Sequence, residues 1–159
     1  MVSQADIDEV SRQLGRPARD ILDIAARCVC GRPLVVKTKP RLGNGTPFPT
    51  LYYLTQPAAT AAISTLEASG YMAQLQELVE TDEQVQGAYL AAHKSYLAER
   101  EAIEVVEEIN DFSCGGMPVR VKCLHALVGH SLAKGPGVNP IGDLALEALD
   151  WSPSRCQCV

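Results

Sequence analysis

The first residues of the chain follow a helical pattern of apolar positions. Ile7, Val10 and Leu14 recur at spacings of three and four, and Ser3 precedes them as a residue type that caps helix starts. Gly15 follows the last apolar position. The pattern predicts a first amphipathic helix that ends near Gly15.

Two short segments with a strand-like composition follow. Residues 34–38 and 51–55 are rich in β-branched and aromatic side chains and are bounded by Pro and Gly, so they predict two strands of a small antiparallel sheet. The apolar run at 21–26 fits either a strand or a short helix, and we favour a strand. The connection at 40–50 holds three prolines and two glycines, which predicts a stiff, shaped loop and not a tight hairpin turn.

From residue 58 onward the apolar period becomes helical. Gly70 is a predicted break between two helices, and Thr81 is a predicted cap for a long helix that runs to about Glu108. A further helix is predicted to start at Pro118 and to end before Gly135, because Pro suits a first turn. A short helix at 141–149 precedes the tail.

These elements predict an α+β fold: one mostly helical domain with a small antiparallel sheet near its N-terminal half. We divide residues 1–159 into a basic α/β module with a Pro/Gly-rich loop (1–56), a helical portion (57–150) and a tail (151–159). The length suits a single domain with its own core, and hydrophobic content of 47% with 21% charged residues is typical of a globular chain.

Composition also bears on the compartment. No apolar run approaches the roughly 20 residues that span a bilayer, and the acidic N-terminus lacks the basic and apolar regions of a secretory signal. We therefore expect a cytoplasmic protein without a membrane span. The six cysteines are then expected to be reduced thiols, metal ligands or a redox pair, and not a disulfide framework.

Charge is distributed unevenly along the chain. Residues 12–41 carry eight cations against two acids, whereas residues 67–111 carry eleven acids against two cations. The basic segment either pairs with acids inside the fold, which we favour, or attracts an anionic ligand or a protein partner.

The residues whose side chains could bind a metal or act in catalysis are concentrated between positions 115 and 130. This stretch holds Cys123, His125 and His130, and an earlier Cys28-Val29-Cys30 turn is expected to meet it in space. Thiolate and imidazole ligands suit zinc, and a closed tetrahedral site needs four of them. The first predicted site is therefore a zinc site of Cys28, Cys30, Cys123 and one of the two histidines.

Helical geometry limits which histidine takes part. On a helix from Pro118, Cys123 and His130 lie about 130 to 150° from the predicted buried stripe, whereas His125 lies within about 70° of it. Cys123 and His130 are also two turns apart, a rise of about 10.5 Å, which is long for two ligands of one ion.

Three alternatives remain open. The tail offers a second Cys-x-Cys turn, Cys156 and Cys158, which with the first turn makes a four-cysteine site. In a nucleophilic enzyme, Cys123 would attack and a histidine would act as its base. In the third alternative none of these residues has a chemical role: the cysteines are small core residues, and the histidines form hydrogen bonds with neighbouring groups.

An anion site is the remaining chemical prediction. Gly115 and Gly116 precede the predicted helix start, where backbone N–H groups and the helix dipole favour anions. The positive side chains of Arg41, Arg120 and Lys122 would attract a phosphate-containing ligand to this site.

Several blocks of the chain resemble an uncharacterised actinobacterial family, domain of unknown function 501. They are RQLGRP at 12–17, TPFPTLYYLT at 46–55, GGMP at 115–118, RVKCLH at 120–125, GPGVNP at 135–140 and GD at 142–143. The resemblance covers nearly the whole chain. It implies a Cys-Pro-Cys or related turn where this chain has Cys28-Val29-Cys30, and a cysteine in some members where this chain has Gln56.

The functional prediction is a non-enzymatic or regulatory cytosolic protein with a candidate structural zinc site. The alternatives are a phosphate or polyanion binder and a Cys/His-dependent enzyme. A cell-division-associated adaptor is a further alternative, which the resemblance alone implies, since members are often encoded beside a septum-formation initiator and an exopolyphosphatase-like protein.

Overall fold

The computed structural model describes residues 2–158, and its first element is the predicted amphipathic helix α1 (Gln4–Leu14). Ser3 caps this helix, because its hydroxyl accepts a hydrogen bond from the Asp6 N–H at 3.1 Å. Gly15 ends the helix in the left-handed region at φ 70°, a conformation that glycine adopts without steric cost. Both predicted ends of the helix are confirmed.

Three strands form one antiparallel sheet in the order β1 (Ile21–Arg27), β2 (Pro33–Thr38) and β3 (Tyr52–Leu54). The central strand β2 is almost wholly buried, whereas β1 is partly exposed at an edge. The two predicted strands are confirmed, and the ambiguous run at 21–26 is the strand that we favoured. The loop from β2 to β3 is shaped by its own bonds, such as Leu42 N–H to the Thr46 carbonyl at 2.9 Å.

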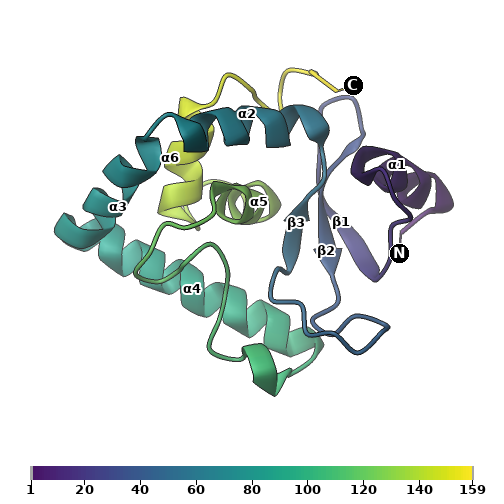
Figure 1. Cartoon of the computed structure of the whole chain (residues 1–159), viewed down its shortest axis with the longest axis horizontal. Coiled ribbons are helices and arrows are strands. Elements are labelled where there is room, and N and C mark those ends of the chain that lie inside the picture. The colour runs from purple at the N-terminus through teal and green to yellow at the C-terminus, as the bar shows by residue number, and fades with distance from the viewer. Residues whose placement is uncertain (1, 159) are drawn as a thin grey trace.

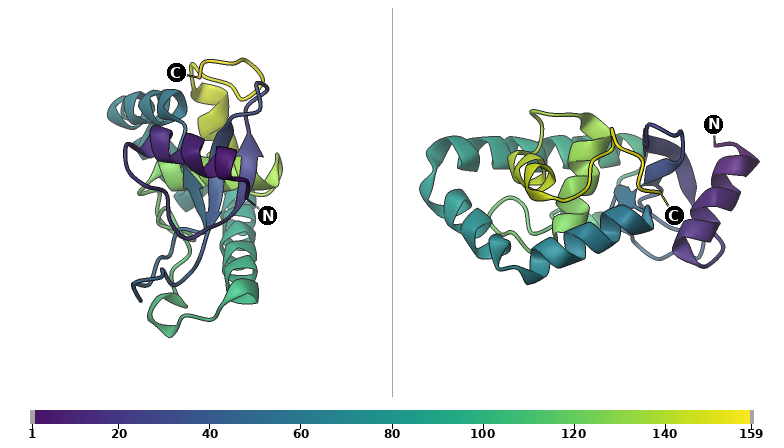
Figure 2. Two further views of the ribbon diagram at one scale, coloured as in Figure 1. Left: turned by 90° about the vertical axis from the view of Figure 1, so that its right-hand side faces the viewer. Right: turned by 90° about the horizontal axis from the view of Figure 1, so that it is seen from above.

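The sheet lies between α1 on one side and the larger helical part on the other (Figure 1). Three helices, α2 (Pro57–Ala68), α3 (Tyr71–Thr81) and α4 (Glu83–Ile103), follow one another around the outside. They frame the central helix α5 (Leu124–Lys134) and the last helix α6 (Pro140–Ala148). Turned views show α1 lying across the far side of the sheet from α4 (Figure 2). This is the predicted α+β fold, a mostly helical domain with a small sheet in its N-terminal half.

Two predicted ends of α4 are wrong. The N-cap is Asp82 and not Thr81, since the Asp82 carboxylate accepts bonds from the Gln84 and Val85 N–H groups. Thr81 ends α3 instead, and its hydroxyl donates to the Glu77 carbonyl. At the other end the helix stops at Ile103, and a short 3-10 turn, Glu107–Ile109, follows.

The predicted start of a helix at Pro118 is also wrong, since α5 begins at Leu124. Gly115 and Gly116 have φ angles of 64° and 95°, so the backbone turns there. The following residues bond back to this turn: the Lys122 N–H donates to the Gly115 carbonyl, and the Arg120 N–H donates to that of Gly116, both at 2.8 Å. A closed loop therefore takes the place of the first turns of the predicted helix.

The prediction that His130 lies away from the buried side of this helix is wrong as well. The side chains of Leu127, Val128 and His130 point in different directions around α5, yet each is 0% exposed. The helix is surrounded by β3, α2 and α6, so it has no solvent face along this stretch. A helical wheel assumes one exposed face, and that assumption fails for a central helix.

No helix within residues 2–158 combines the length and the apolar character that a membrane span requires.

Candidate metal centre

Four cysteines from opposite ends of the chain meet beside the turn that joins β1 and β2. Cys28 and Cys30 lie in that turn, which is closed by bonds from the Cys28 N–H to the Arg32 carbonyl and from the Gly31 N–H to the Cys28 carbonyl, both 2.8 Å. Cys156 and Cys158 lie in the tail after α6, which reaches the turn through a bond from the Val29 N–H to the Pro153 carbonyl at 3.1 Å.

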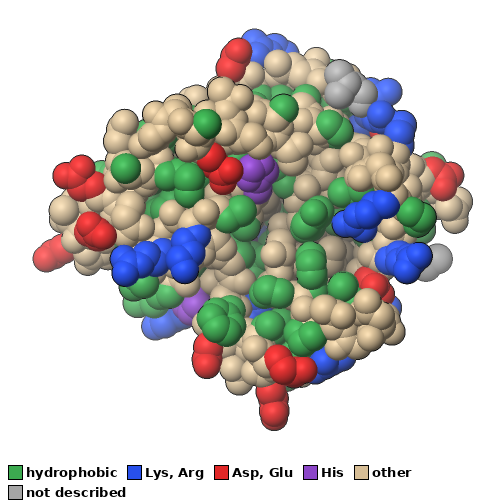
Figure 3. Space-filling view, in the orientation of Figure 1, with side chains coloured by type: hydrophobic (Ala, Val, Ile, Leu, Met, Phe, Trp, Pro, Cys, Tyr) green, Lys and Arg blue, Asp and Glu red, His purple; other side chains and the backbone are tan. Residues whose placement is uncertain are grey.

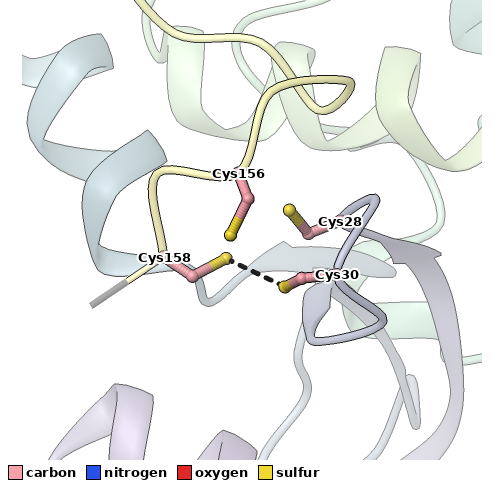
Figure 4. Close-up of side chains that lie close together, drawn as sticks. All are labelled: Cys28, Cys30, Cys156 and Cys158. Carbon is pink, nitrogen blue, oxygen red and sulfur yellow. Dashed lines mark hydrogen bonds between the residues drawn. The ribbon is translucent and has the colours of Figure 1, made fainter.

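The sulfur atoms of this four-cysteine cluster (Cys28, Cys30, Cys156 and Cys158) all lie within 4.8 Å of one another. They point toward a common centre (Figure 4). The Cys30 and Cys158 sulfurs are 3.6 Å apart, much longer than a disulfide bond of about 2.05 Å. Four thiolates at about 2.3 Å from a tetrahedral zinc ion would be about 3.8 Å apart. The spacing of the four sulfurs is therefore compatible with a bound metal ion.

The electrostatics of the cluster favour a bound cation. The backbone N–H of Arg32 lowers the pKa of Cys30 to about 6, so this thiol ionises readily. Burial raises the pKa of Cys158 to about 12, which opposes a second thiolate beside the first. A metal ion offsets that penalty by supplying positive charge between the sulfurs.

Nearby guanidinium groups complement the negative charge of such a site. The Cys30 thiolate raises the pKa of Arg32, and Glu9 together with Cys158 raises that of Arg12. A zinc ion with four thiolates carries two net negative charges, and these two guanidinium groups, which also pair with Glu9, place positive charge beside it.

The cluster is joined to the rest of the fold by Gln56. Its side-chain amide donates to the Cys158 sulfur at 3.2 Å, and its side-chain oxygen accepts from the Ala58 N–H at the start of α2. The side chain is 0% exposed. This is also the position at which the family resemblance implies a cysteine in some members, and such a side chain would face the same cluster.

A second group of metal-ligand types joins α2 to the start of α5. Glu67, Cys123 and His125 form this Glu-Cys-His cluster, in which one carboxylate oxygen, the sulfur and one ring nitrogen all lie within 4.8 Å of one another. The Glu67 Oε2 is 3.3 Å from His125 Nδ1 and also accepts from the Leu124 N–H at 2.9 Å. All three residues are partly buried.

The thiol and the imidazole of the Glu-Cys-His cluster affect each other. A side-chain hydrogen bond from His125 lowers the pKa of Cys123, and the same contact, with the charge of Glu67, raises that of His125. Each of the two side chains therefore favours the charged form of the other.

The structure thus divides the predicted zinc ligands between two places. Cys28 and Cys30 lie with the tail cysteines, which is the four-cysteine alternative that the sequence offers. Cys123 and His125 lie with Glu67 in the other cluster. His130 belongs to neither group, since its Nδ1 is 3.1 Å from the Asn139 side-chain nitrogen.

Glu67 is the ligand candidate that sequence reasoning missed. Its position on α2 carried a signal, because Thr60, Ser64 and Glu67 recur at spacings of four and three on one face. In the structure Ser64 and Glu67 contact His125 through their side chains, whereas Thr60 contacts it through its backbone carbonyl. The sequence signal is therefore the pair of polar side chains of Ser64 and Glu67 on one helix face.

The residues predicted to bind an anion do not converge. The Arg41 guanidinium lies 2.8 Å from a Glu108 carboxylate oxygen and donates to the Gly45 carbonyl. Gly115, Gly116 and Lys122 line one shallow hollow, whereas Arg120 lines another beside Val79 and Glu80. The N–H of Leu124 at the true start of α5 already donates to Glu67.

The uneven charge of the sequence is partly paired within the fold. Arg41 links the basic loop to the acidic segment through Glu104 and Glu108, and Arg27 pairs with Asp6 of α1 at 2.7 Å. Basic and acidic side chains are interspersed over the face drawn in Figure 3. Arg16 and Arg19 line a cavity of about 240 Å³ between α1, the sheet and the β2–β3 loop, and an anionic partner there stays a prediction.

Comparison with known proteins places the chain in a family. Comparison with curated proteins and with solved structures finds no match. A family model described as a protein of unknown function (DUF501) matches residues 24–147. This range contains Cys28, Cys30 and the Glu-Cys-His cluster, and it ends before the two tail cysteines. Because the model matches well over half of its length, the chain belongs to the DUF501 family.

Proposed function

We propose that this protein binds a structural zinc ion through Cys28, Cys30, Cys156 and Cys158, and that it acts as a non-enzymatic or regulatory protein of the cytosol. The observation that carries the proposal is the mutual approach of the four sulfur atoms to within 4.8 Å. Four thiolates occupy all four coordination positions of a tetrahedral zinc ion and leave none for a substrate. This is the arrangement of a structural zinc site.

The role of the metal follows from the segments that it joins. The tail after α6 forms no regular secondary structure within the described residues and reaches the β1–β2 turn through few bonds. A metal bound by all four cysteines would fasten the tail to the sheet, and its binding free energy would contribute to folding.

The cytosolic part of the proposal is supported by the state of the thiols. All six cysteines are free, and the Cys30 and Cys158 sulfurs are at a non-bonded distance of 3.6 Å. A reducing compartment keeps such thiols available as zinc ligands.

The test is zinc analysis with a thiol count on protein purified without chelator or metal-affinity resin. Replacing Cys156 and Cys158 with Ser should remove about one zinc per chain and expose Cys28 and Cys30 to thiol reagents. Cys114→Ser, which removes a thiol outside the cluster, is the matched control and should keep its zinc. Unchanged zinc content in the double variant would overturn the proposal.

A further inference from the structure

The Glu-Cys-His cluster brings three groups that can each donate an electron pair to one place in the fold. Its residues come from two elements, with Glu67 near the end of α2 and Cys123 and His125 at the start of α5. The cluster therefore exists only because α2 packs against α5, and the fold brings a carboxylate, a thiol and an imidazole to one point.

The hydrogen bonds of His125 settle which ring nitrogen carries the proton. Nε2 lies 3.2 Å from the Thr60 carbonyl oxygen and 3.2 Å from the Ser64 hydroxyl. A carbonyl oxygen only accepts, so Nε2 must carry a hydrogen. A backbone carbonyl in this place is the usual way in which proteins orient a metal-binding histidine through its other nitrogen.

The opposite nitrogen then meets an acceptor. In a neutral ring Nδ1 presents a lone pair, yet it lies 3.3 Å from the Glu67 Oε2, which also only accepts. The Cys123 sulfur completes the group within 4.8 Å. Three electron-pair donors that face one another require a cation between them, which is either a proton or a metal ion.

The surrounding backbone holds the donors in place. The Leu124 N–H at the start of α5 donates to Glu67, so the carboxylate takes the capping role that an N-cap side chain usually has. Cys123 occupies the N-cap position of α5, and its side chain makes no capping bond. Its sulfur instead lies within 4.8 Å of the Glu67 carboxylate oxygen and the His125 ring nitrogen.

We propose that Glu67, Cys123 and His125 bind a second divalent cation, with Zn²⁺ the species that suits this mixed set of thiolate, imidazole and carboxylate. Zinc sites with three protein ligands keep a fourth position for water or a substrate oxygen. The His125 and Glu67 side chains are 28% and 25% exposed, so solvent can reach that position. The chain would then have one closed structural site and one open site.

The open site differs from the four-cysteine site in what it allows chemically. The fourth ligand of such an ion is an exchangeable oxygen donor, and zinc lowers the pKa of a bound water toward neutrality. The class of small molecule that fits is an anion or carbonyl compound that offers one oxygen atom to the metal. This inference does not depend on the four-cysteine site.

The experiment measures zinc and cobalt on the full-length chain. Zinc analysis of the wild type should give about two ions per chain, and Glu67→Gln combined with His125→Gln should remove about one of them while the tail cysteines stay protected. Glu77→Gln, an exposed acid on α3, is the matched control and should change nothing. Circular dichroism establishes that each variant is folded.

The variants also separate the two sites. With Cys156 and Cys158 replaced by Ser, added Co²⁺ should still give a tetrahedral absorption spectrum with a thiolate band, and Cys123→Ser should abolish that band. A zinc content that is unaffected by the Glu67 and His125 substitutions, or no cobalt band in the chain without tail cysteines, would show that a proton fills the cluster and would overturn the proposal. Loss of zinc only on tail substitution would support the structural site and reject the open one.

Discussion

At the scale of single residues, His130 shows how a polar ring is accommodated in the core. The ring stacks on Tyr52 with centroids 6.0 Å apart and meets the edge of Tyr96 at 5.0 Å. The Asn139 amide donates to Nδ1 at 3.1 Å, so Nε2 carries the hydrogen of a neutral ring. That Nε2 has no hydrogen-bond partner among the described residues, and burial lowers the pKa of His130 to about 4.

This shift predicts a loss of stability in mild acid. An unfolded histidine has a pKa near 6.5, so between pH 7 and pH 5 the unfolded chain takes up a proton that folded His130 refuses. The free energy of unfolding should fall by about 2 kcal/mol over this interval through His130 alone. Urea unfolding at several pH values measures it. His130→Gln lacks this term, so its stability should fall by about 2 kcal/mol less, and an equal fall in both proteins would contradict the prediction.

At the scale of elements, α5 and α6 approach closely because Gly142 has no side chain. A Cβ placed at Gly142 would clash with the Leu127 carbonyl oxygen and the Ser131 hydroxyl, both on α5. Gly129 makes a similar approach from α5 to β3, since its Cβ would lie 2.9 Å from the Tyr52 carbonyl oxygen. The central helix is thus held between its neighbours at backbone distance, where an added methyl group has no room.

Two glycine substitutions should therefore have opposite effects. Gly142→Ala should lower the free energy of unfolding by about 1 to 3 kcal/mol, because the helices must move apart. Gly87→Ala should raise it by about 0.5 to 1 kcal/mol, since Gly87 is exposed within α4 and its Cβ would meet open space. Denaturant unfolding of both variants provides the comparison, and a stabilised Gly142→Ala protein would refute the packing argument.

Elements whose signals are local could be predicted from the sequence. Ser3 and Gly15 bound α1 by side-chain capping and a positive φ, and the β-branched runs became strands because their pattern fits a buried sheet. The start of α5 could not be predicted in this way. Pro118 suits a first turn of a helix, but the loop from Gly115 bonds back on itself. Gln76 of α3 and Tyr89 of α4 also bond to this loop, and a local pattern does not encode such distant partners.

The candidate ligands were recognised by residue type, yet their grouping depends on tertiary structure. In the sequence, Cys28 and Cys30 can pair either with Cys123 and a histidine or with Cys156 and Cys158. Only the path of the tail in the folded chain shows that Cys156 and Cys158 are the neighbours. Glu67 was one acid among many in an acidic segment, and its role emerges only where α2 meets α5. Helical periodicity also misplaced His130, because α5 is buried on every side between Leu127 and Ser131.

At the scale of the whole molecule, the four-cysteine cluster joins the β1–β2 turn to the tail after α6. Trp151 is 4% exposed and anchors the beginning of the tail in the core. Beyond it, the tail contacts the rest of the fold through the Val29 to Pro153 bond and the Gln56 to Cys158 bond. Few contacts hold this segment, so a metal ion at its end would contribute a large share of its stability.

Chelation should therefore lower the thermal stability of the wild type more than that of the chain with Cys156 and Cys158 replaced by Ser. A ligand present at a thousand times its Kd stabilises the folded state by about 4 kcal/mol, which for a chain of this size is about 10 °C in Tm. In zinc buffer the wild type should unfold about that much higher than the double variant. With chelator in excess, the two proteins should unfold at nearly the same temperature, because Cys156 is exposed and Cys158 only partly buried, so serine at these positions costs little packing. If the gap between the two proteins persists in chelator, the tail is held by packing and not by metal.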